Sequence, residues 1–364
     1  QGTATVMSGK QVRVTFEDGS SSFYFGNKIL IATGSKERRL DIPGADLPGV
    51  MTSEALMTSG GNKYHSLIVL GGGVTGLETA TVFRNLGAKV TIIEVSDHLI
   101  PRIDSEFSDE LERLMRAHGV EIYKGSMSER ITRDEEGVCC EFVCAEGTKR
   151  VHAEALLMSV GRIPNTDGLF APEVPIKMDH GKILVDEFFR TSVPGIYAVG
   201  DVTGGIQLAH VASAQGTYVV EKMNDLTPSV IVSMVPSCLF TPISIVPSCL
   251  YTEPEIASVG LTETQAREKG VQIRVGRYDM KGNGQQIISR ETGGFIKVIF
   301  AANSDVLLGA QIMCARATDM IGELATALAN GLTSTQLMYA MRAHPTFNEA
   351  ISCAVENSRD NIKE

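Results

Sequence analysis

The stretch SLIVLGGGVTGLETATVFRNLGAKVTIIE, Ser66–Glu94, decides how this chain folds. Its first five residues are an apolar run that predicts a short buried strand, and the run stops in a glycine-rich turn. Gly71, Gly73 and Gly76 have the G-x-G-x-x-G spacing. In this spacing the first glycine permits a tight turn, the second lets a pyrophosphate approach the backbone, and the third lets a helix pack against the strand.

The residues after the glycines complete the same unit. A helix is predicted from about Val74 to Leu86, Gly87 is predicted to end it in a left-handed conformation, and Lys89–Ile93 is predicted to be the next strand. Glu94 closes that strand, where a dinucleotide-binding unit carries an acid that accepts the ribose hydroxyls. A carboxylate would repel the additional 2′-phosphate of NADP, so the sequence favours NAD(H).

Composition narrows the class of protein. A chain of 364 residues suggests two or three domains, and 43% hydrophobic with 21% charged residues is ordinary for a soluble globular protein. The net charge of −10 argues against binding nucleic acid, and no apolar run is long enough to span a membrane. Seven cysteines without metal-ligand spacing predict a reduced cytoplasmic protein that has no structural metal.

Cys139 and Cys144 have the spacing of a redox disulfide. The segment Gly137–Cys144, however, has the pattern of a strand, in which residues five apart lie about 16 Å from each other. A disulfide needs its Cα atoms within about 7 Å, so we expect this pair not to be catalytic.

Polar residues follow other predicted strands. Lys28–Ala32 is predicted to end at Thr33-Gly34-Ser35, and Gly195–Val199 is predicted to deliver Gly200-Asp201 to the carboxyl edge of a sheet, where α/β proteins bind ligands. A helix beginning near Leu208 would point its N–H groups at an anion.

Helix caps mark the remaining elements. Asp104 or Ser105 is predicted to cap a helix with its side chain. Thr262 and Thr333 are each followed three residues later by a glutamine, which predicts two capping boxes. These helices alternate with predicted strands from Cys249 onward, which indicates a separate α+β domain.

Together these motifs resemble the flavin-dependent pyridine nucleotide disulfide oxidoreductases, and within that family most closely the dihydrolipoyl dehydrogenases. The stretches that carry the resemblance are Ala32–Ser35, Gly71–Glu78, Val160–Asn165, Ile196–Asp201, Leu208–His210, and His344–Thr346 with Glu349. The resemblance implies an α/β fold of Rossmann-like FAD- and NAD(P)-binding domains plus an α+β dimerisation domain. The expected boundaries are a partial FAD-binding domain at 1–62, an NAD-binding domain at 63–167, the second part of the FAD-binding domain at 168–232, an inserted near-repeat loop at 233–245 and the dimerisation domain at 246–364.

The resemblance implies two cofactors, NAD and FAD. NAD would be held by Gly71, Gly72, Gly73, Val74, Thr75, Gly76, Leu77, Glu78, Glu94, Met127 and Gly161. FAD would be held by Thr33, Gly34, Ser35, Asp201, Gln207, Leu208, Ala209 and His210, with Asp201 on the ribityl chain.

The resemblance also implies a catalytic pair. His344 would be the general acid/base that exchanges protons with the thiols of dihydrolipoamide, and Glu349 would fix its tautomer. Histidine suits this task because its side chain titrates near neutral pH. The complete enzyme would be a homodimer that oxidises protein-bound dihydrolipoamide with NAD, through FAD and a redox disulfide. Its partner would be the lipoyl-bearing protein of a 2-oxo acid dehydrogenase or glycine cleavage complex.

Two features depart from the family. The family's first flavin glycine motif and its G-G-T-C-x-N-x-G-C segment do not occur in the sequence, so we expect an amino-terminally truncated chain that is inactive as an isolated fragment. Val235–Thr241 is echoed by Val246–Thr252, and the second copy is expected to form the first strand of the dimerisation domain. Two alternatives stay open: another NAD(P)H-dependent FAD disulfide reductase, or a non-catalytic dinucleotide-binding or interface-forming remnant.

Overall fold

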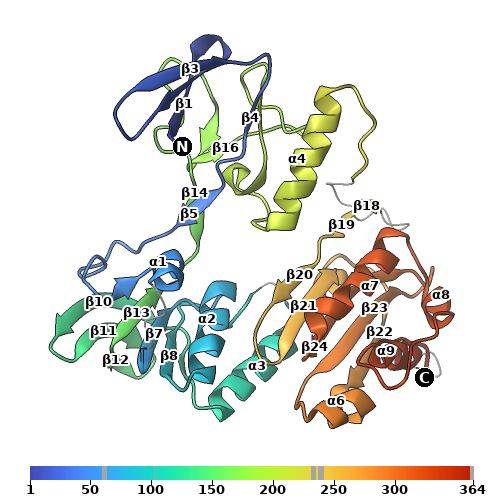
Figure 1. The fold of residues 1–364 in the computed structure, drawn as a ribbon. Helices are drawn as coiled ribbons and strands as arrows, with labels where there is room; N and C mark the ends of the chain where they lie inside the picture. The colour runs from blue at the N-terminus through green and yellow to red at the C-terminus, as the bar shows by residue number, and fades with distance from the viewer. Residues whose placement is uncertain (60–63, 102, 231–234, 237–241, 361–364) are drawn as a thin grey trace. The chain divides into compact units, whose positions relative to one another are not determined.

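The computed structural model describes residues 1–59, 64–101, 103–230, 235–236 and 242–360 (Figure 1). These residues pack as two compact units. The first unit comprises Gln1–Arg38 and Gly161–Ser233, and the second comprises Arg39–Val160 and Met234–Glu364. Among the described residues, no helix is long and apolar enough to cross a membrane.

The first unit is built from short strands around a small core. Its antiparallel sheet consists of β1 (Thr3–Met7), β2 (Gln11–Thr15) and β3 (Ser21–Phe25). Two further strands, β4 (Ile29–Ile31) and β17 (Ile196–Ala198), pair in parallel. Side chains from β1, β4 and β17 form the core, together with Val202 of the short helix η2 (Gly200–Thr203).

Three smaller elements complete this unit. β5 (Ser35–Glu37) pairs antiparallel with β14 (Arg162–Pro164), and β15 (Met178–Asp179) pairs with β16 (Lys182–Ile183). The helix α4 (Ala209–Met223) follows η2, as the sequence predicts. The carboxyl end of β17 therefore leads directly into η2, which carries Asp201.

The second unit contains a five-stranded parallel sheet with the order β6-β13-β7-β8-β9. Its strands are β6 (Val50–Met51), β13 (Ala155–Met158), β7 (Ser66–Leu70), β8 (Lys89–Ile93) and β9 (Glu121–Tyr123). The helix α2 (Val74–Asn85) connects β7 to β8, and α3 (Ser105–Ala117) precedes β9. Ile68 and Val69 of β7 are fully buried, as expected for a strand in the middle of a parallel sheet. The predicted strand, turn, helix and strand from Ser66 to Glu94 is confirmed.

A separate antiparallel sheet consists of β10 (Met127–Asp134), β11 (Gly137–Cys144) and β12 (Gly147–Ala153). Cys139 and Cys144 lie five residues apart along β11 and face different partners across the ladders, Thr132 and Gly147. Both thiols are free. The predicted strand is confirmed, and an extended backbone keeps these two sulfurs from meeting.

The carboxy-terminal part of the second unit is an antiparallel sheet with the order β20-β21-β24-β23-β22. Its strands are β20 (Ser248–Leu250), β21 (Glu255–Gly260), β24 (Leu307–Cys314), β23 (Phe295–Ala301) and β22 (Ile273–Asp279). Two helices, α7 (Ala317–Ala329) and α9 (Glu349–Asp360), pack on this sheet. The shorter helices are α5 (Glu263–Glu268), α6 (Gly284–Ser289) and α8 (Ser334–Met338). Both predicted capping boxes are formed, at the starts of α5 and α8.

The two sheets of the second unit share one core. The ring of Phe107 on α3 lies 4.2 Å from the ring of Phe295 on β23, centroid to centroid. Leu250 and Met313 belong to the same cluster of buried side chains as Leu67 of β7. The five-stranded parallel sheet and the carboxy-terminal sheet are therefore fixed to each other by buried contacts.

One predicted cap has the expected position, since Asp104 is the N-cap residue of α3, but it lacks the side-chain hydrogen bond. Its carboxylate instead accepts hydrogen bonds from the backbone N–H groups of Glu263 and Thr264, at 3.1 and 3.3 Å, at the start of α5. The shared core brings α5 close to Asp104, and this long-range contact replaces the local one.

The remaining expectations concern boundaries. Residues 39–59, which include β6 and the short helix α1 (Ser53–Thr58), pack with the second unit, and the expected boundary between residues 62 and 63 stays a prediction. The second near-repeat copy contains β20. Most of the expected loop at 233–245 lies outside the described residues, and its described parts form the paired strands β18 (Val235–Pro236) and β19 (Pro242–Ile243).

Candidate functional site

The glycine turn between β7 and α2 is tightly packed on one side and open on the other. Gly71 has φ of 105°, and a Cβ there would lie 2.5 Å from the carbonyl oxygen of Ser159. A Cβ at Gly76 would lie 2.0 Å from the carbonyl oxygen of Gly71, so side chains are excluded at both positions. A Cβ at Gly73 would meet nothing within 4 Å. The backbone at the start of α2 is therefore accessible to a ligand, and helix N-termini attract anions.

Glu94 lies beside this turn, where it was expected. Its Oε2 accepts a hydrogen bond from the backbone N–H of Gly72 at 2.5 Å, and its Oε1 accepts one from Ser96 at 2.7 Å. The residue is only 9% exposed. The two N–H groups hold the carboxylate at the edge of the turn with lone pairs left to accept further hydrogen bonds.

Backbone hydrogen bonds help to fix the surroundings of Met127 and Glu78, two of the residues expected to hold NAD. The backbone N–H of Ser126 donates to the carbonyl oxygen of Glu94, so Met127, which is 60% exposed, is held next to the end of β8. Glu78 on α2 accepts a hydrogen bond from the backbone N–H of Tyr251 at 3.0 Å, which ties α2 to the residue after β20. Burial raises the pKa of the Glu78 carboxyl group, although the Tyr251 N–H opposes this shift.

The expected flavin residues lie in the first unit. The Ser35 hydroxyl donates to Asp201 Oδ2 at 2.6 Å, and Thr33 Oγ1 donates to the carbonyl oxygen of Asn165 at 2.8 Å. Gly34 accepts from the backbone N–H of Asn165. The turn at 207–210 starts α4, and the side chain of its N-cap residue, Leu208, makes no capping hydrogen bond. Ser35 and Asp201 are thus brought together from positions 166 residues apart.

Arg162 joins the same cluster and was not expected to. Its Nε donates to Ser35 Oγ at 2.7 Å, and its Nη2 donates to Ser35 O at 2.8 Å. The pairing of β5 with β14 brings the two residues together. Arg162 stands next to Gly161 in one of the motifs of the sequence, but only the strand pairing reveals its partner.

His344 and Glu349 form a hydrogen-bonded pair in the second unit. His344 Nδ1 lies 2.8 Å from Glu349 Oε1, and the backbone N–H of Thr346 donates to Glu349 Oε2 at 2.9 Å. These two contacts, the Thr346 N–H first and His344 second, lower the pKa of the Glu349 carboxyl group. An ionised carboxylate only accepts hydrogen bonds, so Nδ1 of a neutral His344 carries the proton and Nε2 is the acceptor. The His344 side chain is 77% exposed, which leaves it accessible to a reactant.

Comparison with known proteins identifies the family. Residues 1–216 match the family described as pyridine nucleotide-disulphide oxidoreductase, and residues 246–355 match the dimerisation domain of that family. The chain belongs to this family.

Relatives within the family have more specific names. A dihydrolipoyl dehydrogenase of Bacillus subtilis is 34% identical over 98% of this chain and 73% of its own length. A dihydrolipoyl dehydrogenase of Chlorobaculum tepidum is 37% identical over 96% of this chain and 72% of its own length.

Solved structures agree on the fold. LpdA of Mycobacterium tuberculosis matches with a TM-score of 0.87 at 28% identity, over 99% of this chain and 76% of that one. The HOCl-induced flavoprotein disulfide reductase RclA of Escherichia coli matches with a TM-score of 0.86 at 28% identity, over 98% of this chain and 78% of that one. The expected fold class is confirmed.

Membership in the pyridine nucleotide-disulphide oxidoreductase family identifies the chain as an NAD-dependent FAD disulfide oxidoreductase, with FAD and NAD(H) as its cofactors. Features of this structure fit both cofactors. The accessible backbone at Gly73 and the held carboxylate of Glu94 suit a dinucleotide, and the oriented Asp201 carboxylate suits the hydroxyls of a flavin chain. The roles of the individual residues stay predictions.

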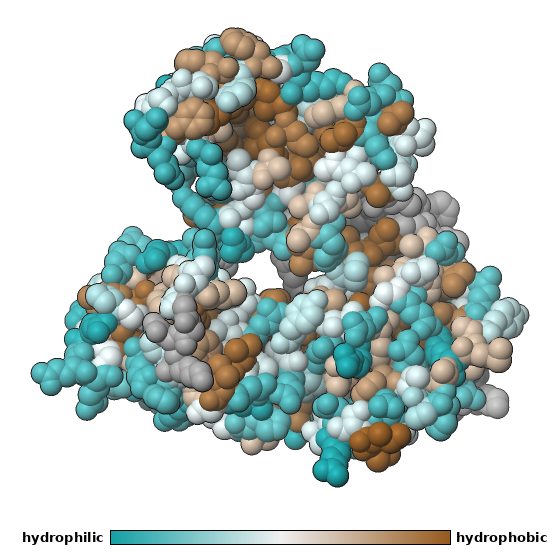
Figure 2. Space-filling view, in the orientation of Figure 1, coloured by the Kyte–Doolittle hydropathy of each residue, from teal (hydrophilic) through white to brown (hydrophobic). Residues whose placement is uncertain are grey.

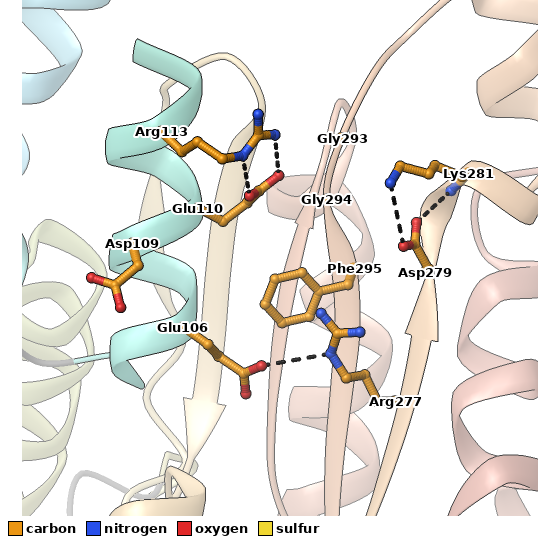
Figure 3. A pocket seen from close by; sticks show the side chains of 10 residues that line it. All are labelled: Glu106, Asp109, Glu110, Arg113, Arg277, Asp279, Lys281, Gly293, Gly294 and Phe295. Atoms are coloured by element: carbon orange, nitrogen blue, oxygen red, sulfur yellow. Dashed lines mark hydrogen bonds and ion pairs between the residues drawn. The ribbon is translucent and has the colours of Figure 1, made fainter. Parts of the chain in front are cut away.

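A pocket of about 450 Å³ in the second unit lies elsewhere, between α3 and the strands β22 and β23 (Figure 3). Its charged side chains pair with one another: Arg113 with Glu110 at 2.7 Å, and Arg277 with Glu106 at 3.5 Å. Arg277 also stacks 4.2 Å from the centre of the Phe295 ring. None of the expected cofactor or catalytic residues lines this pocket, and its ion pairs account for most of its charges.

Proposed function

We propose that the protein is a dihydrolipoyl dehydrogenase, which oxidises dihydrolipoamide carried by a lipoyl-bearing protein and reduces NAD. The hydrogen-bonded pair of His344 and Glu349 is the observation that carries this proposal, because thiol oxidation needs a group that accepts the thiol proton. The partner would be the lipoyl-bearing protein of a 2-oxo acid dehydrogenase or glycine cleavage complex. The names of the relatives support this substrate.

The proton transfer follows from the geometry of the pair. A thiol becomes a good nucleophile when it loses its proton, and Nε2 of neutral His344 accepts that proton. Glu349, held by the Thr346 N–H, then faces the imidazolium through Nδ1 and stabilises its charge. In the reverse direction the imidazolium returns the proton to a lipoamide sulfur. Bound FAD supplies the two-electron relay between thiols and NAD.

The cofactors would be held as the sequence predicts. The open turn at Gly73 and the first N–H groups of α2 would bind the pyrophosphate of NAD, and Glu94 would accept the ribose hydroxyls. Ser35 would orient Asp201 toward the ribityl chain of FAD. Leu208 and its neighbours at the start of α4 would direct N–H groups at FAD.

An apolar surface near His344 supports a homodimer. Figure 2 shows hydrophobic side chains at α6, where Ile287 and Ile288 are each 64% exposed. The loop before His344 adds Tyr339, 76% exposed, and Met341, 99% exposed. A Cβ at Gly284 of α6 would lie 3.9 Å from His344 Cε1, so the start of α6 adjoins the catalytic pair. We infer that two copies pair through it and that His344 acts in the active site of the partner subunit.

One alternative within the family deserves a direct test. The structural relatives include a HOCl-induced flavoprotein disulfide reductase at the same identity as LpdA. Glu94 disfavours the members that use NADP, because its carboxylate would repel a 2′-phosphate.

The deciding experiment compares substrates in the holoenzyme with FAD bound. We expect NADH-dependent reduction of lipoamide to exceed reduction of glutathione disulfide, and NADH to exceed NADPH as donor. Faster turnover of glutathione disulfide than of lipoamide would favour the alternative reductase.

A further inference from the structure

The loop between α8 and α9 carries His344, and its position depends on few packing contacts. Tyr339, Met341 and His344 are largely exposed, so burial does little to fix this part of the loop. A catalytic side chain that is misplaced by 1 Å can cost about 100-fold in rate. Other contacts must therefore hold the loop.

Arg342 supplies several of these contacts. Its side chain is only 5% exposed although it lies two residues before His344. Its Nε donates to Glu323 Oε1 on α7 at 3.1 Å, Nη2 also pairs with that oxygen, and Nη1 donates to Ser352 Oγ on α9 at 2.6 Å. Nη1 also reaches the carbonyl oxygens of Leu337 and Ala340 at 3.4 Å. The guanidinium thus joins the loop to two helices.

Glu323 holds the other end of the same loop. Its Oε1 accepts hydrogen bonds from the Arg342 guanidinium, and its Oε2 accepts a hydrogen bond from Asn348 Nδ2 at 3.1 Å. Asn348 immediately precedes Glu349, the hydrogen-bond partner of His344. A single carboxylate on α7 therefore connects Arg342, two residues before His344, to Asn348, the residue before Glu349.

We propose that Arg342 and Glu323 are positioning residues that hold the 342–348 loop in the form in which His344 bonds Glu349. This inference rests on the proposed function, because it assumes that His344 exchanges protons with the substrate. Neither residue touches the reacting atoms; both act through the pair. An arginine suits this position better than a lysine because its planar fork serves two helices at once, whereas a lysine offers a single ammonium group.

The test uses the holoenzyme and two assays. Arg342→Met is expected to lower lipoamide turnover about 10- to 100-fold and to leave NADH-to-dye electron transfer unchanged, because the dye needs no proton from His344. Glu323→Gln should lower lipoamide turnover in the same direction. Arg342→Lys should retain part of the activity. Arg316→Met, at an exposed ion pair at the start of α7, is the matched control and should change neither rate.

A double-mutant cycle separates positioning from general damage. If Arg342 acts only through His344, then Arg342→Met should cause no further loss of lipoamide turnover in a His344→Gln background. Additive losses, or an equal loss of dye reduction, would overturn the positioning role. If Arg342→Met does not accumulate as a folded protein, Asn348→Ala, which removes a single tether, takes its place in the same cycle with the same expectations.

The outcomes also distinguish this inference from the proposed function. Full lipoamide turnover by His344→Gln would reject the proposed function, and the positioning role with it. Loss of turnover in His344→Gln together with full turnover in both Arg342→Met and Asn348→Ala would reject the positioning role alone.

Discussion

Lys297 Nζ lies 3.1 Å from Asp104 Oδ2 in the interior of the second unit, where the two side chains are 6% and 4% exposed. The pair connects β23 to the start of α3. Lys297 also pairs with Glu263 at 2.8 Å and with Glu106, while Gln311 Nε2 donates to Asp104 Oδ2 at 2.6 Å. This buried cluster links the start of α3, which packs with the five-stranded parallel sheet, to the carboxy-terminal sheet. It should therefore contribute to the stability of both sheets.

Replacing Lys297 should destabilise the second unit strongly. Lys297→Met leaves the buried carboxylate of Asp104 without a cation, and removing one member of a buried pair costs about 3–5 kcal/mol. The free energy of unfolding in urea measures this loss. Lys281→Met, at a lysine that is 80% exposed, is the control and should change it by less than about 0.5 kcal/mol. Equal free energies of unfolding for the two variants would contradict a stabilising role for the Lys297–Asp104 pair.

The same cluster predicts a dependence of stability on acid. Burial by itself would raise the pKa of Asp104, but the charge of Lys297 and the N–H groups at the start of α5 outweigh it, so the pKa lies below its ordinary value. A carboxyl group of this kind stabilises the folded state above its unfolded pKa, about 3.9. That stabilisation is lost as the pH falls through the lower pKa of the folded state.

Asp104→Asn should therefore lower the free energy of unfolding near neutral pH and flatten its decline below about pH 4. Urea unfolding of the variant and the parent protein between about pH 6 and pH 3 measures the two slopes. The control is Asp109→Asn at an exposed position of the same helix, which should keep the slope of the parent. An unchanged slope in Asp104→Asn would count against the role of this carboxyl group.

Glu94 should determine the choice between NADH and NADPH. We expect the protein to bind NADH in calorimetric titration, and Glu94→Arg to weaken NADH by about 10- to 100-fold while improving NADPH relative to it. Glu94→Gln should weaken NADH without favouring NADPH, because it removes the charge but adds no cation. Glu129→Arg, at an exposed position of β10, is the control. Unchanged preference in Glu94→Arg would refute the assignment of this carboxylate to the ribose.

His344 should be needed for lipoamide and not for dyes. In the holoenzyme, His344→Gln should lower lipoamide turnover by about 10²- to 10⁴-fold, the contribution of general acid/base catalysis, and leave NADH-to-dye transfer nearly intact. Glu349→Gln should cost less, because the imidazole stays present and loses only its partner. Steady-state assays of both reactions measure the ratio.

Mixed dimers test whether each active site is shared between two chains. The His344→Gln variant and a variant with a disrupted flavin site, Asp201→Arg, should each have little activity toward lipoamide. Random mixing should restore about a quarter of the parent activity, since half of the dimers are mixed and each has one complete site. Recovery of no activity from dimers shown to be mixed would mean that His344 acts within its own chain.

The sequence by itself determined the features that depend on neighbours along the chain. The strand, glycine turn and helix from Ser66 onward follow from apolar periodicity and from the lack of room for a side chain at Gly71 and Gly76. The capping box of Thr262 was predictable for the same reason, since its partner lies three residues away. The extended form of β11 was predictable from its composition, and with it the separation of Cys139 from Cys144.

Only the tertiary structure decided which distant side chains meet. Asp104 stands where a local cap was expected, yet its carboxylate bonds residues 159 and 160 positions away, because the packing of α3 against the carboxy-terminal sheet offers buried donors that outweigh a local N–H group. Arg162 meets Ser35 through strand pairing, and Arg342 meets Glu323 through the packing of α7 beneath the loop. Periodicity and turn chemistry act over a few residues, whereas these partners are chosen by the shape of the core and by the cost of leaving a buried charge unpaired.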